Sequence, residues 1–130
     1  AAAAIAGAAE AAQKQQDQKR VLVIHSTRRD SLISEAADRV LTQHLASAFG
    51  PRLDYYAEFI DPTRFPDADY ERFSAYIRDR YPQLKPDLVV AVEDAAFGFV
   101  ARYRETLFAG TPVVFFTRDA DASRLPNSTG

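Results

Sequence analysis

The sequence contains no cysteine, and this absence excludes three kinds of chemistry together. The chain forms no disulfide, offers no thiolate to a metal ion and has no cysteine nucleophile. It also lacks any apolar run close to the roughly 18 residues that a membrane-spanning helix needs. Its formal net charge of −2 argues against nucleic acid or an anionic membrane surface as the main partner, because both attract basic proteins.

Several short enzyme motifs are also missing. No glycine-rich phosphate loop follows the first predicted strand, and no Gly-x-Ser-x-Gly nucleophile elbow occurs. A phosphoacceptor receiver domain is expected to carry paired acids after its first strand, where this chain has His25 and Ser26. Glu93 and Asp94 are adjacent carboxylates, but too few further oxygen ligands can be placed near them for a metal site. An enzymatic use of Glu93 and Asp94 is therefore the last-ranked hypothesis, and we expect a chain that is not an enzyme, with no cofactor and no bound metal.

Length and composition indicate one globular domain. The chain has 130 residues, of which 47% are hydrophobic and 26% are charged, and this is enough to build a sizeable core. Residues 1–20 are expected to form an alanine-rich N-terminal extension, in which Ile5 is the one large apolar side chain. The alternative is the start of a secreted protein just after signal cleavage. The predicted α/β domain covers residues 21–130.

The segment from Pro86 to Phe116 predicts the centre of the fold. Leu88–Val92 is a continuous apolar run rich in β-branched residues, typical of a strand buried on both faces. Asp94 is the predicted N-cap of a helix that extends to about residue 108, and Gly110 is placed to end it. Val113–Phe116 predicts a second buried strand. Strand, helix and strand over about thirty residues indicate a parallel, right-handed crossover.

Two similar units precede this segment, and the first begins with the predicted strand Val21–Ile24. A helix follows, with Ser31 or Asp30 as its cap and Gly50-Pro51 as its stop. Its apolar residues recur at intervals of three and four: Leu32, Ile33, Ala36, Ala37, Val40, Leu41, Leu45 and Ala48. His44 falls within this stripe and is expected to be partly buried.

The second unit begins with the predicted strand Leu53–Ile60. Its aromatic residues alternate in part, so we expect it near a sheet edge. Asp67 or Asp69 is the predicted cap of the next helix, which Pro82 ends. The inward-facing residues of that helix are Tyr70, Phe73, Ile77 and Tyr81. The order βαβαβαβ predicts a flavodoxin-like, three-layer α/β/α fold with a parallel sheet in strand order 2-1-3-4, and no further element after residue 116.

In open α/β sheets, ligands bind outside the carboxyl ends of the strands. Each predicted strand is followed there by polar residues, and a lone His25 at this edge could titrate near neutral pH without supporting a triad or a metal site. The predicted ligand-binding residues are Ser26, Thr27, Arg28, Asp61, Glu93, Asp94, Thr117 and Arg118.

Most of these residues also have a structural interpretation. Asp94 is more often a helix cap than a ligand contact, although one residue can do both. Ser26 and Thr27 are as well explained by hydrogen bonds to loop amides as by contact with a ligand. Asp61 before a proline is a natural turn initiator. Arg28, with its neighbour Arg29, is either a solvated loop charge or part of a site for a carboxylate or phosphate.

Three segments and one further residue carry a resemblance to a known family. They are Val-Leu-Val-Ile-His-Ser at 21–26, Lys-Pro-Asp-Leu-Val-Val-Ala-Val-Glu-Asp at 85–94, Tyr-Arg-Glu-Thr-Leu-Phe-Ala-Gly-Thr-Pro-Val-Val-Phe-Phe at 103–116, and Asp61 at the end of the second strand. Together they resemble the ABC-transporter-substrate-binding-like extracytoplasmic sensor domains that precede bacterial histidine kinases, with their transport relatives. The resemblance covers about residues 20–130.

The resemblance implies the N-terminal lobe of a type I periplasmic binding protein. Such a lobe is extracytoplasmic, membrane-tethered in the full-length protein, and binds a small solute without turnover. The implied ligand-side residues are Ser26, Thr27, Glu93, Asp94 and Thr117. These proteins close two lobes around a ligand, so we expect residues 21–130 to be one lobe, either a fragment or half a cleft. Arg28 and Arg29 stand where relatives are expected to carry an aromatic residue, so no ligand class is carried over.

The expected partners depend on whether the chain is a binding lobe or a scaffold module. A binding lobe requires a small-molecule ligand and a second lobe, kinase or transporter component. The alternative function is a receiver-like or scaffold module that acts through protein contacts, for which a homodimer is a candidate assembly. No nucleic-acid partner is expected.

Overall fold

The computed structural model describes residues 18–61, 69–83, 85–116 and 128–129. Most of the predicted N-terminal extension and residues 117–127 lie outside these ranges. The elements in chain order are β1 (Lys19–His25), α2 (Leu32–Phe49), the 3-10 helix η1 (Gly50–Arg52), β2 (Leu53–Phe59), α3 (Tyr70–Arg80), β3 (Leu88–Val92), α4 (Glu93–Leu107), β4 (Val113–Phe116) and β5 (Ser128–Thr129).

The strands form one sheet in the order β2-β1-β3-β4-β5, and every neighbouring pair is parallel. The predicted order 2-1-3-4 is confirmed, and β2 lies at the predicted edge. The register places Val23 of β1 beside Ala57 of β2 on one side and Val90 of β3 on the other. The prediction that no element follows β4 is wrong, because residues 128–129 form the short strand β5. It pairs with β4, which would otherwise be the second edge.

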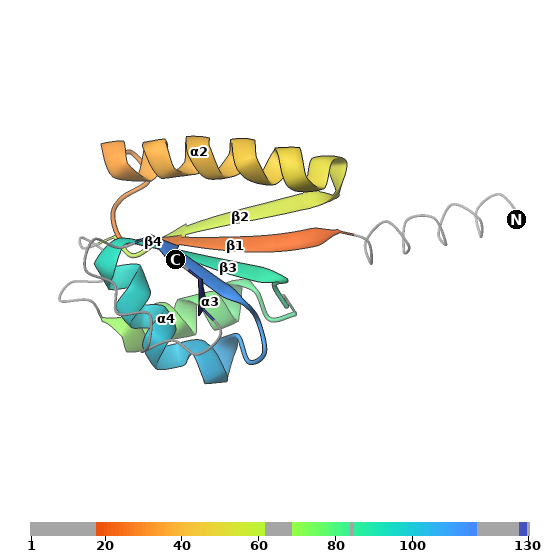
Figure 1. Ribbon diagram of the computed structural model, residues 1–130. Helices are drawn as coiled ribbons and strands as arrows, with labels where there is room; N and C mark the ends of the chain where they lie inside the picture. Colours follow the sequence, from red (N-terminus) through yellow and green to blue (C-terminus); the bar gives the residue numbers. More distant parts are fainter. Residues whose placement is uncertain (1–17, 62–68, 84, 117–127, 130) are drawn as a thin grey trace, which may run out of the picture.

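Helices cover both faces of the sheet, as Figure 1 shows, with α2 on one face and α3 and α4 on the other. Alternate side chains of a strand point to opposite faces, so β1 contributes to both layers. Leu22 and Ile24 pack in the cluster with α3 and α4, whereas Val21 and Val23 pack in the cluster with α2. The three-layer α/β/α architecture predicted from the alternation of elements is confirmed.

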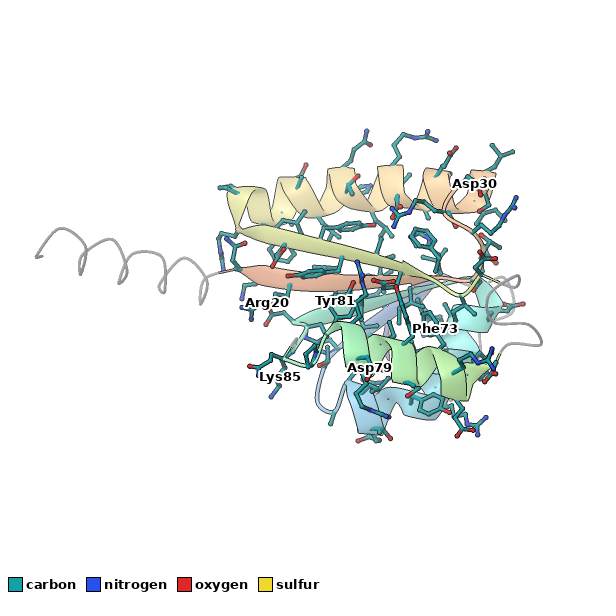
Figure 2. The ribbon with its side chains drawn as sticks, turned by 180° about the vertical axis from the view of Figure 1, so that it is seen from behind. Arg20, Asp30, Phe73, Asp79, Tyr81 and Lys85 are labelled. Atoms are coloured by element: carbon teal, nitrogen blue, oxygen red, sulfur yellow. The ribbon has the colours of Figure 1, made fainter. Side chains whose placement is uncertain are left out.

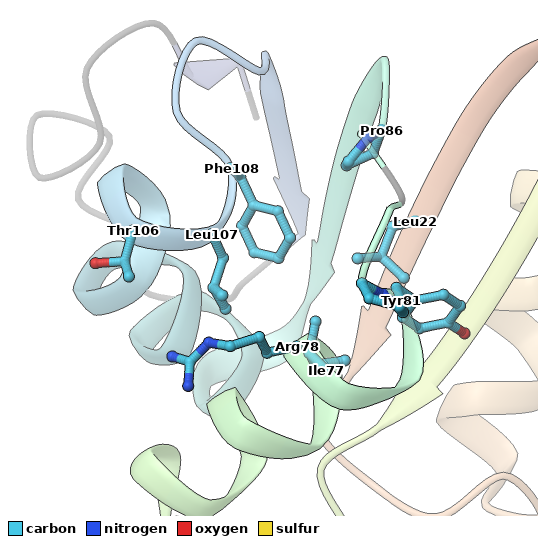
Figure 3. Close-up of a pocket in the computed structure, with 9 residues that line it drawn as sticks. Leu22, Ile77, Arg78, Tyr81, Pro86, Thr106, Leu107 and Phe108 are labelled. Carbon is cyan, nitrogen blue, oxygen red and sulfur yellow. The ribbon is translucent and has the colours of Figure 1, made fainter.

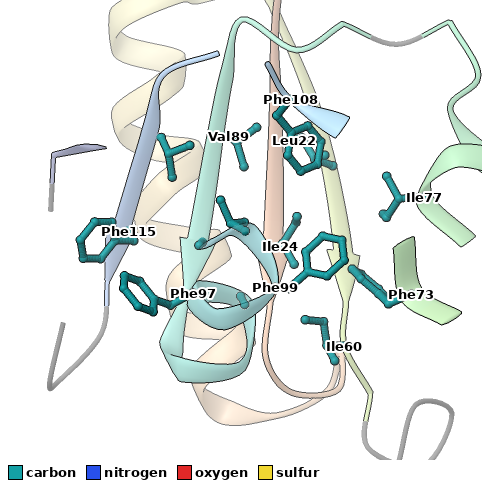
Figure 4. Packing of buried hydrophobic residues seen from close by; sticks show 14 residues of the cluster. Leu22, Ile24, Ile60, Phe73, Ile77, Val89, Phe97, Phe99, Phe108 and Phe115 are labelled. Atoms are coloured by element: carbon teal, nitrogen blue, oxygen red, sulfur yellow. The ribbon is translucent and has the colours of Figure 1, made fainter. Parts of the chain in front are cut away.

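The larger cluster lies under α3 and α4 and is rich in phenylalanine (Figure 4). Phe73 of α3 meets Phe99 of α4 edge-on, with ring centroids 4.8 Å apart. The two helices approach closely at Gly98, where an added Cβ would lie 2.5 Å from the Tyr70 hydroxyl oxygen. A residue without a side chain is therefore needed at this crossing unless Tyr70 moves.

The helix ends follow the predicted signals in most places. The Ser31 side chain caps α2 by accepting from the amide three residues later at 3.1 Å, and Asp69 caps α3 in the same way at 3.0 Å. The alternative cap Asp67 lies outside the described residues. Gly50 (φ 56°) ends α2 and Gly110 (φ 78°) lies in the turn after α4, both in the left-handed region that favours glycine.

The apolar stripe predicted on α2 is too wide. Leu41 is buried as expected, but Leu32 is 84% exposed and Val40 is 48% exposed. His44, expected to be partly buried, is exposed, and the polar Ser34 is buried instead. The reason is geometric: among the described residues no second helix lies beside α2 in its layer, so only the side that faces the sheet is covered.

Candidate functional site

The carboxyl ends of the strands bring several predicted site residues to one edge of the sheet. His25 ends β1 and is followed by Ser26 and Thr27, Asp61 lies two residues beyond β2, and Glu93 directly follows β3. Because neighbouring strands are parallel, these residues share one edge. Figure 2 places Asp30, in the loop after β1, at one end of the molecule, with Arg20 and Lys85 at the other. Thr117 and Arg118 lie outside the described residues.

Ser26 connects the ends of two neighbouring strands. Its hydroxyl donates to the carbonyl oxygen of Val92 at 2.6 Å and accepts from the amide of Ala96 at 2.8 Å. It therefore links the end of β1 to the first turn of α4. The prediction that Asp94 caps this helix is wrong: α4 begins at Glu93, has no capping side chain of its own at residue 92, and leaves Asp94 exposed.

Glu93 adopts a backbone conformation that is unfavourable for residues with a side chain. Its φ is 68°, and it is the one non-glycine residue with positive φ in the described part of the chain. Such a conformation costs roughly 1–3 kcal/mol and persists where the surrounding structure imposes it. Here the abrupt change from β3 to α4 imposes it at the sheet edge where the predicted site lies.

The hydroxyl of Thr27 anchors the loop after β1 to α2. It lies 2.6 Å from the Ser31 hydroxyl oxygen and 2.9 Å from that of Ser34. Ser31 is also the cap of α2, so the three hydroxyl groups form one network at the helix start. This network fixes the path of the loop that carries Arg28 and Arg29.

A buried polar cluster that the sequence patterns missed lies beneath this loop. His25 is fully buried, and its Nε2 lies 2.9 Å from Oδ1 of Asp38 on α2. The Tyr55 hydroxyl of β2 donates to the same oxygen at 2.5 Å. Burial lowers the pKa of His25, although Asp38 opposes that effect, and burial with the hydrogen bond to Asp38 raises the pKa of Tyr55. His25 is therefore a neutral imidazole near pH 7.

Phe59 joins this buried cluster to the surface. Its ring stacks on the His25 ring, with centroids 4.6 Å apart and an angle of 9° between the planes. The guanidinium carbon of Arg29 lies 4.6 Å from the same Phe59 centroid. An exposed arginine thus rests on an aromatic ring that a buried histidine holds in place.

A cavity of about 190 Å³ opens beside these residues, between the loop after β1, the end of β2 and α3. It combines positive, negative and aromatic side chains: Arg28, Arg29, Glu58, Phe59, Asp61, Tyr76 and Arg80. The structure therefore brings together two residues predicted as ligand contacts, Arg28 and Asp61. Ser26, Thr27, Glu93 and Asp94 are at the same sheet edge but do not line this cavity.

Glu58 is the centre of a second polar cluster that was not predicted. It is 5% exposed and accepts hydrogen bonds from the hydroxyl groups of Tyr76, at 2.8 Å, and of Tyr81. Arg80 forms an ion pair with it, Nε to Oε1 2.7 Å. Burial and the bond to Glu58 raise the pKa of Tyr81 to about 12. An acid between Ala57 and Phe59, near the end of a strand rich in aromatic residues, was the available signal.

A different cavity, of about 290 Å³, lies between α3 and α4 near the amino ends of the strands (Figure 3). Leu22, Ile77 and Phe108 give it mainly apolar walls, and Pro86, two residues before β3, also lines it. None of the predicted site residues line it. It is therefore separate from the polar edge described above.

Comparison with family models, with curated proteins and with solved structures finds no match for this chain. The fold defines the class: an α/β protein with a parallel sheet and helices on both faces. Within the described ranges, no helix is long and apolar enough to cross a membrane. The same ranges contain no group of three or more histidine, aspartate or glutamate residues that could hold a metal ion.

Proposed function

We propose that this chain is a lobe of an extracytoplasmic sensor or transport protein that binds a small solute without turning it over. The observation that carries the proposal is the 190 Å³ cavity at the carboxyl edge of the parallel sheet, lined by charged and aromatic side chains. Ligands of open α/β folds bind at this edge, and small-molecule sites combine a concave surface with a few polar groups.

Two further features support a binding role for this edge. Glu93 holds a strained backbone conformation there, and strained residues cluster at functional sites. The loop after β1 is held by the Thr27 hydroxyl network and by Ser26, so the arginines that it carries are presented from an ordered scaffold. An ordered scaffold loses less conformational entropy when a ligand binds.

The resemblance of residues 21–26, 85–94 and 103–116 to sensor lobes gives the proposal its biological setting. In that setting the lobe lies in the periplasm, is tethered to the membrane in the full-length protein, and works with a second lobe and a histidine kinase or transporter component. The lobe itself is not an enzyme. Closure of two lobes around the solute would transmit the signal.

A thermal-shift screen of the purified chain against pools of small solutes tests this function. A ligand that binds the native state stabilises it by about 2.7 kcal/mol at a hundred times its dissociation constant, which corresponds to a rise in melting temperature of several degrees. Arg28→Gln, at a predicted ligand contact that lines the cavity, should reduce that rise, whereas Arg39→Gln, which removes an exposed arginine on α2 outside the cavity, should not. If no solute raises the melting temperature, the proposal is wrong.

A scaffold function is the second candidate, and the exposed apolar side of α2 favours it. Leu32, Ile33 and Val40 are exposed along this helix, beside an apolar cavity of about 270 Å³. Exposed apolar surface of this kind marks contacts with other proteins. Sedimentation that depends on protein concentration, abolished by Val40→Glu, would support this function, and a monomer at all concentrations would argue against self-association.

A further inference from the structure

We infer that the solute carries an anionic group, a carboxylate or a phosphate, and that this group binds the guanidinium of Arg29 in the 190 Å³ cavity. The inference rests on the proposed solute-binding function and names the ligand chemistry. It depends on the balance of charge in the cavity and on the way in which Arg29 is held.

The first argument is the charge that the cavity leaves unbalanced. Three arginines line it with two acids, Glu58 and Asp61, so the lining carries one excess positive charge. Glu58 is nearly buried and its charge is balanced by the ion pair with Arg80, so this pair adds little net charge to the cavity. Arg28 pairs with Asp30 at 3.4 Å on the open surface, where such a pair is weak.

Arg29 differs from the other two arginines that line the cavity. Within the described ranges it forms no ion pair with a carboxylate, and it stands over the Phe59 ring instead. Contact with an aromatic face forms no bond to a carboxylate, so the guanidinium keeps N–H donors for a ligand. Those donors match the two oxygens of a carboxylate or phosphate.

The second argument is that Arg29 rests on a rigid support. Phe59 is stacked on His25, which is fully buried and bound to Asp38. A ring held in this way limits the orientations that the guanidinium can adopt. An arginine that is already oriented loses less entropy when it binds an anion, so the affinity rises.

The size of the cavity limits how much of the ligand it holds. About 190 Å³ accommodates a phosphate or a small carboxylate group but not a whole drug-sized molecule, for which 300–1,000 Å³ is typical. We therefore place the anionic group of the solute here, with the rest of the solute extending along the sheet edge toward Ser26 and Glu93.

Isothermal titration calorimetry of the full 130-residue chain at constant ionic strength tests the inference. The probes are inorganic phosphate, succinate, glucose and putrescine, which separate the two anion types from neutral and cationic solutes. We expect phosphate or succinate to bind. Arg29→Gln should weaken that binding at least tenfold, and Arg29→Lys should weaken it less, because lysine keeps the charge but loses the planar fork.

The matched control is Arg39→Gln, which removes an exposed arginine on α2 outside the cavity and should leave the affinity unchanged. Equal weakening by both glutamine variants would overturn the inference, because binding would then follow net charge alone. If glucose or putrescine binds and neither phosphate nor succinate does, the inference is overturned and the proposed function stays intact. If none of these probes binds, the inference is also overturned, while the proposed function is judged by the wider solute screen.

Discussion

The hydroxyl oxygen of Ser26 lies 2.8 Å from the backbone nitrogen of Ala96, although 70 positions separate the two residues in the chain. The same hydroxyl donates to the carbonyl of Val92 at the end of β3. One side chain therefore connects the exits of two neighbouring strands and binds the first turn of the helix between β3 and β4. This connection fixes the part of the sheet edge where we place the ligand.

Ser26→Ala should destabilise the protein by about 1 kcal/mol, the usual net contribution of a hydrogen bond to stability. The measurement is the free energy of unfolding from urea titration. Ser47→Ala, at an exposed position of α2, is the control and should be neutral or slightly stabilising, because alanine has the higher helix propensity. Equal stability of wild type and Ser26→Ala would show that the Ser26 hydrogen bonds contribute nothing.

Tyr55→Phe should lower stability by roughly 1.5–3 kcal/mol, the range for hydrogen bonds to a charged group. The change removes the hydroxyl that donates to Asp38 at 2.5 Å and leaves the ring in place. Tyr103→Phe provides a control in a partly buried tyrosine of α4 that packs against the core. A loss no larger for Tyr55→Phe than for Tyr103→Phe would contradict the assignment of Asp38 as the acceptor of this cluster.

Stability should fall in acid because of His25. Burial lowers its folded-state pKa below the unfolded value of 6.5, so below that pH the unfolded chain binds a proton that the native chain resists. The free energy of unfolding is thus unaffected by this group above pH 6.5 and decreases as the pH falls from 6.5 toward the lower folded-state pKa. Asp38 and Arg29 are the charged groups that act on it.

His25→Gln removes this titration, so its free energy of unfolding should change less than that of wild type between about pH 7.5 and pH 5. Chemical denaturation at a series of pH values gives both curves. The comparison uses the slope and not the absolute stability, because replacing a buried histidine also disturbs packing. Parallel curves would refute the prediction.

Glu93→Gly should stabilise the protein by about 1 kcal/mol, since glycine adopts a φ of 68° without steric conflict. At the adjacent position, Asp94→Gly should instead destabilise, because Asp94 lies in the first turn of α4 with no positive φ. If the strain at Glu93 serves ligand binding, the more stable Glu93→Gly variant will bind solute less tightly. Unchanged affinity would assign the strain to the β3–α4 turn alone.

The fold was largely predictable from local patterns. Leu88–Val92 and Val113–Phe116 are continuous apolar runs between clear breakers, and the structure confirms both strands with the predicted bounds. The alternation of strands and helices then leads to the parallel order. The width of the buried face of α2 could not be predicted, because it depends on which elements cover the helix and not on the spacing of its apolar residues.

The candidate site was predictable only in outline. Parallel strands place the residues that follow them at one edge, so Arg28 and Asp61 were correctly expected to come together. The partners within the site come from distant positions: Ser26 binds the first turn of α4 from the end of β1, and Asp38 reaches His25 from a neighbouring helix. Such pairings depend on tertiary packing, which no local spacing reveals. Glu58 gave only a weak signal for the same reason.

Mapping of backbone amide chemical shifts during titration with phosphate or succinate tests the central claim most directly. The account predicts that the largest changes fall in the loop that follows β1, at residues 26–30, and at the end of β2, at residues 59–61, and that Arg29→Gln reduces them. Changes centred on the amino ends of the strands, near Pro86 and Phe108, would contradict it.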